Sequence, residues 1–272
     1  MTHPIAQHLP HKTAANTRLH QLVYLRDLLR ELVGREIKLR YKRSFLGLSW
    51  SLLHPLAQLL VFTLVFSTIL PLNIPNYPAF LFTGLLAWTW FQSSLQYATG
   101  AIVNNPELIK RPGFPTAILP IVTVTNHLIH YLLALPILLI FLWIVGLKPG
   151  AALLAFPLLL LLQFLFTLGL AYLAATLHVV FRDTEHLLVI ALFLLFYLSP
   201  VFYDVGLLPE YARRLFALNP LVHLLEAHRT ILLEQTLPDW PPLLLLTSFS
   251  LLLLAGSYRL FNKMSDSFVE EL

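Results

Sequence analysis

The sequence contains no cysteine among its 272 residues, which excludes a disulfide framework and any cysteine-ligated metal site. Charge is also scarce, because charged residues make up 12% of the chain against about a quarter of a typical soluble domain. None of the ten glycines belongs to a phosphate-binding loop of the form G-x-x-x-x-G-K-[ST]. The chain therefore cannot hydrolyse ATP by that route. Soluble globular, disordered and nucleic-acid-binding proteins are disfavoured by the same composition.

Long runs without charge replace the missing polar surface. Hydrophobic residues make up 57% of the chain, and the mean hydropathy is +0.73. From Ser44 to Pro106 no residue is acidic or basic. One helix of that length would be about 95 Å long, roughly three times the hydrocarbon thickness of a bilayer. The run must therefore turn, and the prolines and asparagines of residues 71–78 supply turn chemistry.

The same reasoning along the chain predicts an all-α integral membrane protein with six transmembrane helices. The spans are expected near 48–70, 79–103, 117–146, 152–180, 187–203 and 240–260. Residues 1–43 form a cytoplasmic arm, 44–262 the six-span domain and 263–272 a cytoplasmic tail. Residues 207–234 are too charged and too interrupted to span, and they predict short re-entrant or interfacial helices between spans five and six.

The basic residues set the expected orientation. With the N-terminus in the cytoplasm, 14 of the 18 lysines and arginines fall in cytoplasmic segments and 4 in outer segments. Lys148, Arg213, Arg214 and Arg229 are the four outer ones. Six spans then place both termini in the cytoplasm of a multi-pass protein of the cell (inner) membrane. The first 40 residues lack a continuous apolar core, so a cleaved signal peptide is not expected.

Residues 18–43 have the pattern of an amphipathic helix. Its two arcs are formed by Leu22, Leu25, Leu29, Leu32 and Val33 on one side and by Asp27, Arg30, Glu31, Arg35 and Lys38 on the other. Such a helix can anchor the arm on the membrane surface. It can also dock a cytoplasmic partner, and the sequence leaves both interpretations open.

The expected spans contain no central Asp, Glu, Lys or Arg. Secondary transporters normally use such residues to couple ions or protons, so ion-coupled transport is disfavoured. His127 and His130 share one helix face, a spacing that permits a metal site or an acid–base pair. Without a neighbouring carboxylate or cysteine, hydrogen-bonded packing histidines are favoured, and no metal site is predicted.

Trp88, Trp90 and Phe91 lie near the middle of the second expected span, where tryptophan is unusual. Apolar aromatic faces suit sugar rings and also lipid tails. Trp88 and Trp90 are about 200° apart around a helix, so at most one of the two indoles can face a given pore. Packing between helices remains the alternative for at least one of them. The end of span five carries a second aromatic group, Phe196, Tyr197, Phe202 and Tyr203.

Four patches in order along the chain resemble a known family. They are residues 29–47 (LRELVGREIKLRYKRSFLG) with Trp50 and His54-Pro55, residues 105–111 (NPELIKR) with Phe114-Pro115 and Ile118-Leu119-Pro120, residues 181–187 (FRDTEHL) with Leu198-Ser199-Pro200-Val201, and residues 218–222 (LNPLV) with 226–229 (EAHR). The chain resembles the membrane subunits of ABC-2 type exporters of polysaccharides, which are the O-antigen, capsule and teichoic-acid permeases.

The resemblance implies a half-transporter that pairs as a homodimer and binds a separate nucleotide-binding ABC ATPase subunit. ATP and Mg²⁺ would belong to that partner, so this chain would hold no cofactor and would not itself be an enzyme. The implied ATPase contacts are Asp27, Arg30, Glu31, Arg35 and Glu36 on the N-terminal helix, Glu107, Lys110 and Arg111 after span two, and, more weakly, Arg182 and Asp183. The helices within 207–234 would be outer gate helices.

The implied substrate is a polysaccharide on a polyprenyl diphosphate lipid. A diphosphate needs cations at the inner membrane surface, and Arg40, Lys42 and Arg43 lie there just before span one. Ordinary topology-setting charge is the alternative for these three residues. The glycan path would use aromatic side chains, and its candidates are Trp88, Trp90, Phe91, Phe196, Tyr197, Phe202 and Tyr203.

Three other functions compete with polysaccharide export. An ABC-2 exporter of another cargo, such as a drug or a lipid, would share the fold. A membrane-embedded enzyme would use His127 and His130. A passive scaffold for a glycan synthesis complex would need no ATPase partner.

Overall fold

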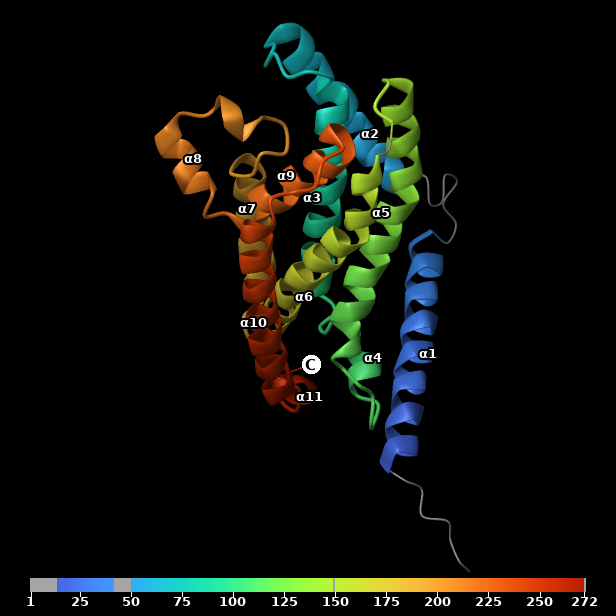
Figure 1. The fold of residues 1–272 in the computed structure, drawn as a ribbon. Helices are drawn as coiled ribbons and strands as arrows, with labels where there is room; N and C mark the ends of the chain where they lie inside the picture. Colours follow the sequence, from blue (N-terminus) through green and yellow to red (C-terminus); the bar gives the residue numbers. More distant parts are fainter. Residues whose placement is uncertain (1–13, 42–49, 149, 272) are drawn as a thin grey trace, which may run out of the picture.

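The computed structural model describes residues 14–41, 50–148 and 150–271, and all regular structure within them is helical. The helices, in chain order, are α1 (Ala14–Tyr41), α2 (Trp50–Thr63), η2 (Leu64–Ile69), α3 (Tyr77–Thr99), α4 (Pro106–Ile109), α5 (Ile118–Ile144), η3 (Ala151–Ala155), α6 (Phe156–Val180), α7 (Thr184–Tyr197), η4 (Val205–Leu207), α8 (Glu210–Phe216), α9 (Pro220–Arg229), η5 (Thr230–Glu234), α10 (Trp240–Met264) and α11 (Phe268–Glu271). Figure 1 shows the long helices bundled along one axis.

Within the described residues, three helical segments are long and apolar enough to cross a membrane. They are Ile118–Ile144, Ala151–Val180 and Trp240–Met264. Shorter apolar helices lie at Leu53–Ile69 and Thr184–Tyr197. A helix also occupies the expected position of span two, where α3 runs from Tyr77 to Thr99. The chain is therefore an all-helical membrane protein.

The turn expected between the first two spans is present before α3. Asn73 and Asn76 adopt positive φ angles of 56° and 48°, a left-handed conformation that asparagine tolerates better than most residues. Pro78 then occupies the first turn of α3, where its missing N–H costs nothing. These residues end one helix and begin the next within a few positions.

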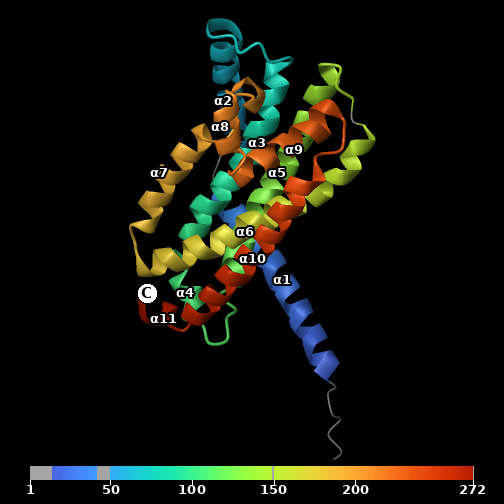
Figure 2. The same cartoon turned by 60° about the vertical axis from the view of Figure 1, so that its left-hand side comes forward.

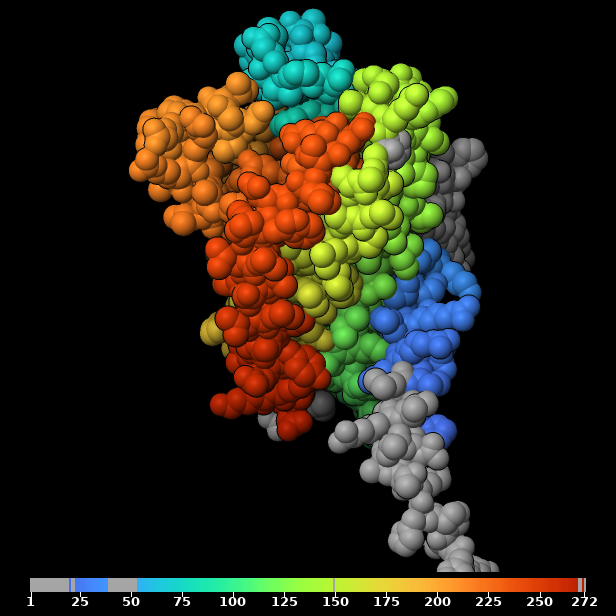
Figure 3. Space-filling model, in the orientation of Figure 1, coloured from blue at the N-terminus to red at the C-terminus, as the bar shows by residue number. Residues whose placement is uncertain are grey.

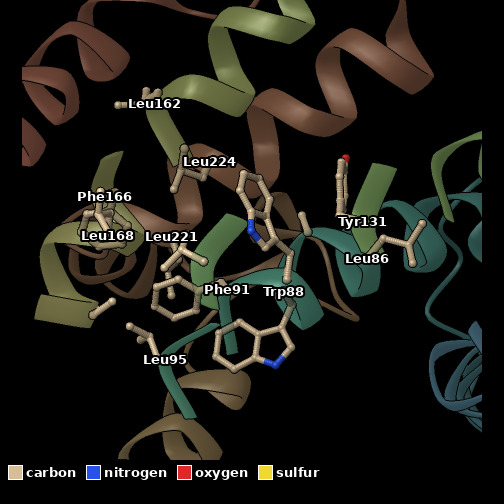
Figure 4. Packing of buried hydrophobic residues seen from close by; sticks show 14 of the residues in the cluster. Leu86, Trp88, Phe91, Leu95, Tyr131, Leu162, Phe166, Leu168, Leu221 and Leu224 are labelled. Atoms are coloured by element: carbon tan, nitrogen blue, oxygen red, sulfur yellow. The ribbon is translucent and has the colours of Figure 1, made fainter. Parts of the chain in front are cut away.

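α3 forms the centre of the bundle and contacts α2, α5, α6, α7 and α9. Its hydroxyl side chains satisfy themselves on their own helix, since Thr83, Ser94 and Thr99 each donate to the carbonyl four residues earlier. Figure 4 shows the apolar packing around it, with the α3 side chains Leu86, Trp88, Phe91 and Leu95 among Tyr131 of α5, Leu162, Phe166 and Leu168 of α6, and Leu221 and Leu224 of α9. A helix this buried needs no charged face.

α6 and α10 make the most extensive helix pair, and they run side by side in Figures 1 and 2. Gly169 allows their close approach, because a Cβ there would lie 3.1 Å from Leu253 and from the backbone nitrogen of Leu254. Below this point Tyr172 packs its ring against Phe261, at 5.2 Å between centroids, and donates its hydroxyl to the Ala117 carbonyl at 2.7 Å.

α1 lies along α5 at the edge of the bundle, as Figure 3 shows. Val33 is buried there, and Leu28, Leu29, Leu32 and Ile37 are partly buried against the same core. Leu25, which the sequence places on the apolar arc, is 39% exposed. Among the side chains described, the buried face of α1 thus lies within residues 28–37, where the helix packs on α5.

The molecule has two distinct ends. The start of α1, the short helix α4, the corner between α6 and α7, and α11 lie at one end, which we call the α4 end (Figures 1 and 2). Residues 70–76, the helix α8 and η5 lie at the opposite end, which we call the α8 end. The first and last described helices, α1 and α11, therefore both reach the α4 end.

Candidate functional site

The α4 end gathers the residues that the sequence assigns to contact with an ATPase. On α1, Asp27, Arg30, Glu31 and Arg35 are exposed and Glu36 is half-buried; Glu107, Lys110 and Arg111 are exposed beside α4, and Arg182 and Asp183 are exposed at the corner between α6 and α7. All three groups present charge to solvent. We call this set the charged face.

The loop after α3 holds its charges outward for local reasons. Pro106 begins α4, Leu108 and Ile109 turn into the core, and Glu107 remains exposed on the opposite side of the single turn. Asn105 anchors the turn by donating its side-chain amide to the Ala101 carbonyl at 2.9 Å. The loop is thus tethered by two apolar side chains and one hydrogen bond.

α1 and this loop meet across a small cavity of about 220 Å³. Leu32, Arg35 and Glu36 line it from α1, and Asn104 and Asn105 line it from the residues just before α4. The first two charged groups, which are about 70 residues apart in sequence, therefore adjoin in the fold. A partner that binds one would touch the other.

The third group lies where α6 turns into α7. Arg182 donates to the backbone carbonyl of Glu271 at 3.4 Å, which joins the corner to α11. Phe268 holds α11 in place, because it is buried against Phe261 with 5.0 Å between ring centroids. Arg182 is thus shared between the surface and the C-terminal helix, whereas Asp183 faces solvent.

The cations assigned to a lipid diphosphate lie outside the described part of the chain. Lys42 and Arg43 fall in the gap between α1 and α2, and Arg40 is within α1 but its side chain is not described. These three assignments remain predictions.

The aromatic candidates at the end of span five come together in one group. Phe202 lies at its centre, with its ring 5.7 Å from Phe62, 5.4 Å from Phe66 and 5.6 Å from Phe196. Tyr197 and Tyr203 complete it, at 5.9 Å and 5.0 Å from Phe202. We call these six residues the aromatic cluster. It joins η2 and α2, α7, and the segment after α7.

Only one of the three aromatic candidates on α3 meets this cluster. Trp88 packs edge-on against Phe196 at 5.6 Å and donates its indole N–H to Gln92 at 2.6 Å. Trp90 instead contacts Tyr131 of α5 at 5.4 Å, and Phe91 stacks on Phe166 of α6 at 5.9 Å. The helical rotation between the two indoles thus turns Trp88 toward the aromatic cluster and Trp90 toward α5.

His127 and His130 are buried on α5 with 5.9 Å between their ring centroids. Tyr97 of α3 lies 5.1 Å from the His127 ring, so the environment is aromatic. Within the described ranges no group of three or more His, Asp or Glu side chains could hold a metal ion.

Arg229 is one of the four outer cations and ends the EAHR patch of the family resemblance, but the sequence predicts no role for it. It is only 5% exposed, its guanidinium lies 3.5 Å above the Phe80 ring, and it donates to the Val201 carbonyl at 2.8 Å. A signal was present, because Val222, Leu225 and Arg229 recur at spacings of three and four and therefore share the buried face of α9.

Comparisons with known proteins show the family to which the chain belongs. A family model described as "ABC-2 type transporter" matches residues 27–233. The O-antigen export system permease protein RfbA of Myxococcus xanthus is 36% identical over 256 residues, which cover 93% of this chain and 98% of the relative. A protein of the same name from Klebsiella pneumoniae is 31% identical over 254 residues, with the same two coverages.

A more distant relative has a different name. The polysialic acid transport protein KpsM of Escherichia coli is 25% identical over 241 residues, which cover 86% of this chain and 92% of the relative. The family match spans most of the chain, including the second half of α1, α4, the corner after α6, and α9. The chain therefore belongs to the ABC-2 type transporter family.

Proposed function

We propose that the chain is the membrane subunit of an ATP-binding cassette exporter that moves a polyprenyl-diphosphate-linked polysaccharide across the cell (inner) membrane. The observation that carries the proposal is the 36% identity, over 93% of the chain, to a relative named as an O-antigen export permease. The aromatic cluster and the charged face give this function a physical basis at two separate places.

The proposed topology has six spans and both termini in the cytoplasm. The α4 end is then cytoplasmic and the α8 end faces outward. The distribution of lysine and arginine supports this orientation, because 14 of 18 fall in the segments placed inside. The spans would be α2 with η2, α3, α5, η3 with α6, α7, and α10.

The working unit would be a homodimer. α7 supports this, because its large apolar side chains Leu187, Val189, Ile190, Phe193 and Leu194 are exposed, and Phe193 packs against Tyr197 of the aromatic cluster. An unpartnered apolar helix face in a membrane can meet lipid or a second subunit. A second copy would place two aromatic clusters on either side of one path.

The charged face would bind a separate ATPase subunit that holds ATP and Mg²⁺. Closure of two ATPase subunits on nucleotide would push α1 and the α4 loop together, since both border the same small cavity. The movement would reach the α8 end through α3, which begins there and continues into the α4 loop. The two halves of the dimer would then rock apart and together.

The aromatic cluster would guide the sugar chain. Aromatic faces attract the apolar faces of sugar rings weakly and without fixed hydrogen bonds, so a polymer can slide past them. Trp88, Tyr197 and Tyr203 add polar atoms at the edges, and the Tyr203 hydroxyl donates to the Tyr197 carbonyl at 2.9 Å. The diphosphate would be met first by Arg40, Lys42 and Arg43 at the inner surface.

Deletion of the gene is expected to remove a surface polysaccharide while its lipid-linked precursor accumulates in the cell. Electrophoresis of extracted glycolipids, with and without a complementing copy, measures both pools. A normal surface glycan in the deletion strain, together with a defect in export of a drug or lipid, would replace this function with the alternative cargo.

Charge reversal on α1 should break the complex with the ATPase. The double variant Glu31→Lys with Arg35→Glu is expected to reduce co-purification of the ATPase roughly tenfold or more, because like charges then face each other at the contact. Affinity capture of the tagged permease from detergent extracts measures this. A matched control is Glu210→Lys with Arg214→Glu on α8, which reverses an exposed pair at the opposite end. Equal ATPase recovery from both variants would contradict the assignment.

Shortening the aromatic cluster should slow export without preventing assembly. Tyr203→Ala is expected to lower the surface polysaccharide several-fold, because loss of stacking area weakens contact with passing sugars. Tyr203→Phe keeps the ring and should retain most export. Unchanged export in the alanine variant, with normal ATPase capture, would count against the aromatic path.

A further inference from the structure

A large cavity of about 830 Å³ opens at the α8 end of the molecule. Its wall comes from residues within 74–80 at the start of α3, from Leu147 after α5, from Asp204 and Val205, and from residues within 223–243, which hold α9, η5 and the start of α10. Figures 1 and 2 place these elements beside one another at that end. The cavity is therefore assembled from four separate parts of the chain.

The wall of the cavity is strongly acidic. The segments at the α8 end contain five acidic residues, and four of them line the cavity: Asp204, Glu226, Glu234 and Asp239. The fifth, Glu210, is bonded to Arg214 on α8. Arg229 is the one arginine or lysine that lines the cavity among the described residues. Carboxylates thus outnumber guanidinium groups four to one.

These carboxylates are close enough to influence one another. Burial raises the pKa of the Glu226 carboxyl. The positive charges of His223 and Arg229 oppose this rise, whereas the neighbouring carboxylates of Asp204 and Glu234 add to it. A further negative charge brought into the cavity would meet the same repulsion.

Arg229 is poorly placed to cancel that repulsion for a ligand. Its guanidinium covers Phe80 at 3.5 Å, and one of its terminal nitrogens already donates to Val201. Its Nε is buried as well, so it is not open to a ligand in the cavity. The wall therefore offers mainly carboxylate acceptors, which suit hydroxyl groups as hydrogen-bond donors.

The cavity adjoins the aromatic cluster directly. The Tyr77 hydroxyl donates to the Phe202 carbonyl at 2.9 Å, and the Tyr77 ring stacks on the cavity residue Phe80 at 6.4 Å. Asp204 follows Tyr203 in the chain and lines the cavity. A polymer that leaves the cluster toward the α8 end therefore meets the acidic wall next.

We propose, on the basis of the function proposed above, that this cavity is a charge filter at the outward end of the glycan path. It admits neutral polysaccharides, whose hydroxyls bond the carboxylates of the wall. It repels polysaccharides that carry a carboxylate or phosphate on each repeating unit, because like charge at a contact discriminates against a wrong partner.

Two strains that lack their own permease provide the test, one that assembles a neutral O-polysaccharide and one that assembles polysialic acid. Each strain receives this chain together with the ATPase that belongs to this chain, and the surface polysaccharide is measured. The wild-type chain is expected to export the neutral polymer at least roughly tenfold better than the anionic one. Equal export of both polymers would overturn the filter.

A neutralised wall supplies the second measurement. The triple variant Glu226→Gln, Glu234→Gln and Asp239→Asn should raise the ratio of anionic to neutral export at least roughly fivefold, whereas Glu210→Gln should not change it. Capture of the ATPase by each variant reports assembly. An unchanged ratio in an assembled triple variant overturns the filter. Failure of the wild-type chain to export the neutral polymer contradicts the proposed function itself, and the filter with it.

Discussion

Replacing Gly84 with alanine is expected to lower both the thermal stability of the permease and its export activity. A Cβ at this position would lie 2.7 Å from a guanidinium nitrogen of Arg229 and 2.8 Å from the Val201 carbonyl oxygen. The side chain of Arg229 cannot simply swing away, because it is itself bonded to Val201. The carbonyl is backbone and must shift with its segment. Overpacking of this kind costs about 1–3 kcal/mol.

Gly256→Ala on α10 is the matched control, because nothing lies within 4 Å of a Cβ added there. Alanine also favours a helix over glycine by about 1 kcal/mol, so this variant should unfold at the wild-type temperature or slightly above it. Thermal unfolding of both purified variants in one detergent gives the comparison. If Gly84→Ala unfolded at the same temperature as Gly256→Ala, the close approach of α3 to the Val201 segment would be wrong.

The positions of the long helices could be predicted because they depend on one simple quantity, the length of chain without charge. The run predicted near 117–146 corresponds to α5 at Ile118–Ile144, and the one near 240–260 begins with α10 at Trp240. The turn before α3 was equally readable, since its asparagines and prolines act locally. None of these features needs knowledge of which helix packs against which.

Features that depend on packing between distant segments were harder to predict. Rotation around α3 excluded a shared face for Trp88 and Trp90, but the partner of each indole came only from the fold. The cavity at the α8 end could not be read at all, because its four parts lie up to 170 residues apart in the chain. Spacing on α9 could have indicated that Arg229 is buried, yet its contacts with Phe80 and Val201 are tertiary.

Arg229→Met is expected to abolish most export while leaving the stability of the permease nearly unchanged. The guanidinium joins three elements, because it extends from α9, lies on Phe80 of α3 and bonds the segment after α7 at Val201. A hydrogen bond from a charged group contributes about 1.5–3 kcal/mol, and a desolvated cation–π contact about 2 kcal/mol. Burial of the charge costs several kcal/mol, which offsets most of this gain. Methionine avoids that cost and fills similar volume.

Export and stability should respond differently to Arg229→Met. The stability of the permease includes both the contacts of the guanidinium and the cost of burying its charge, whereas the position of the joined elements depends on the contacts alone. Without the bond to Val201, the segment that carries Phe202 and Asp204 loses one of its ties to α9, which also include the bonds of Asn219 to Leu198 and Ser199. A loss of 1.5–3 kcal/mol changes the occupancy of one arrangement by roughly 10- to 150-fold. Arg229→Lys keeps a charge but lacks the planar group that covers Phe80 and bonds Val201 together. Arg229→Lys should therefore export poorly. It should also be less stable than Arg229→Met, because it still buries a charge. Near-normal export in a stable Arg229→Met variant would show that the guanidinium does not hold these elements in their working arrangement.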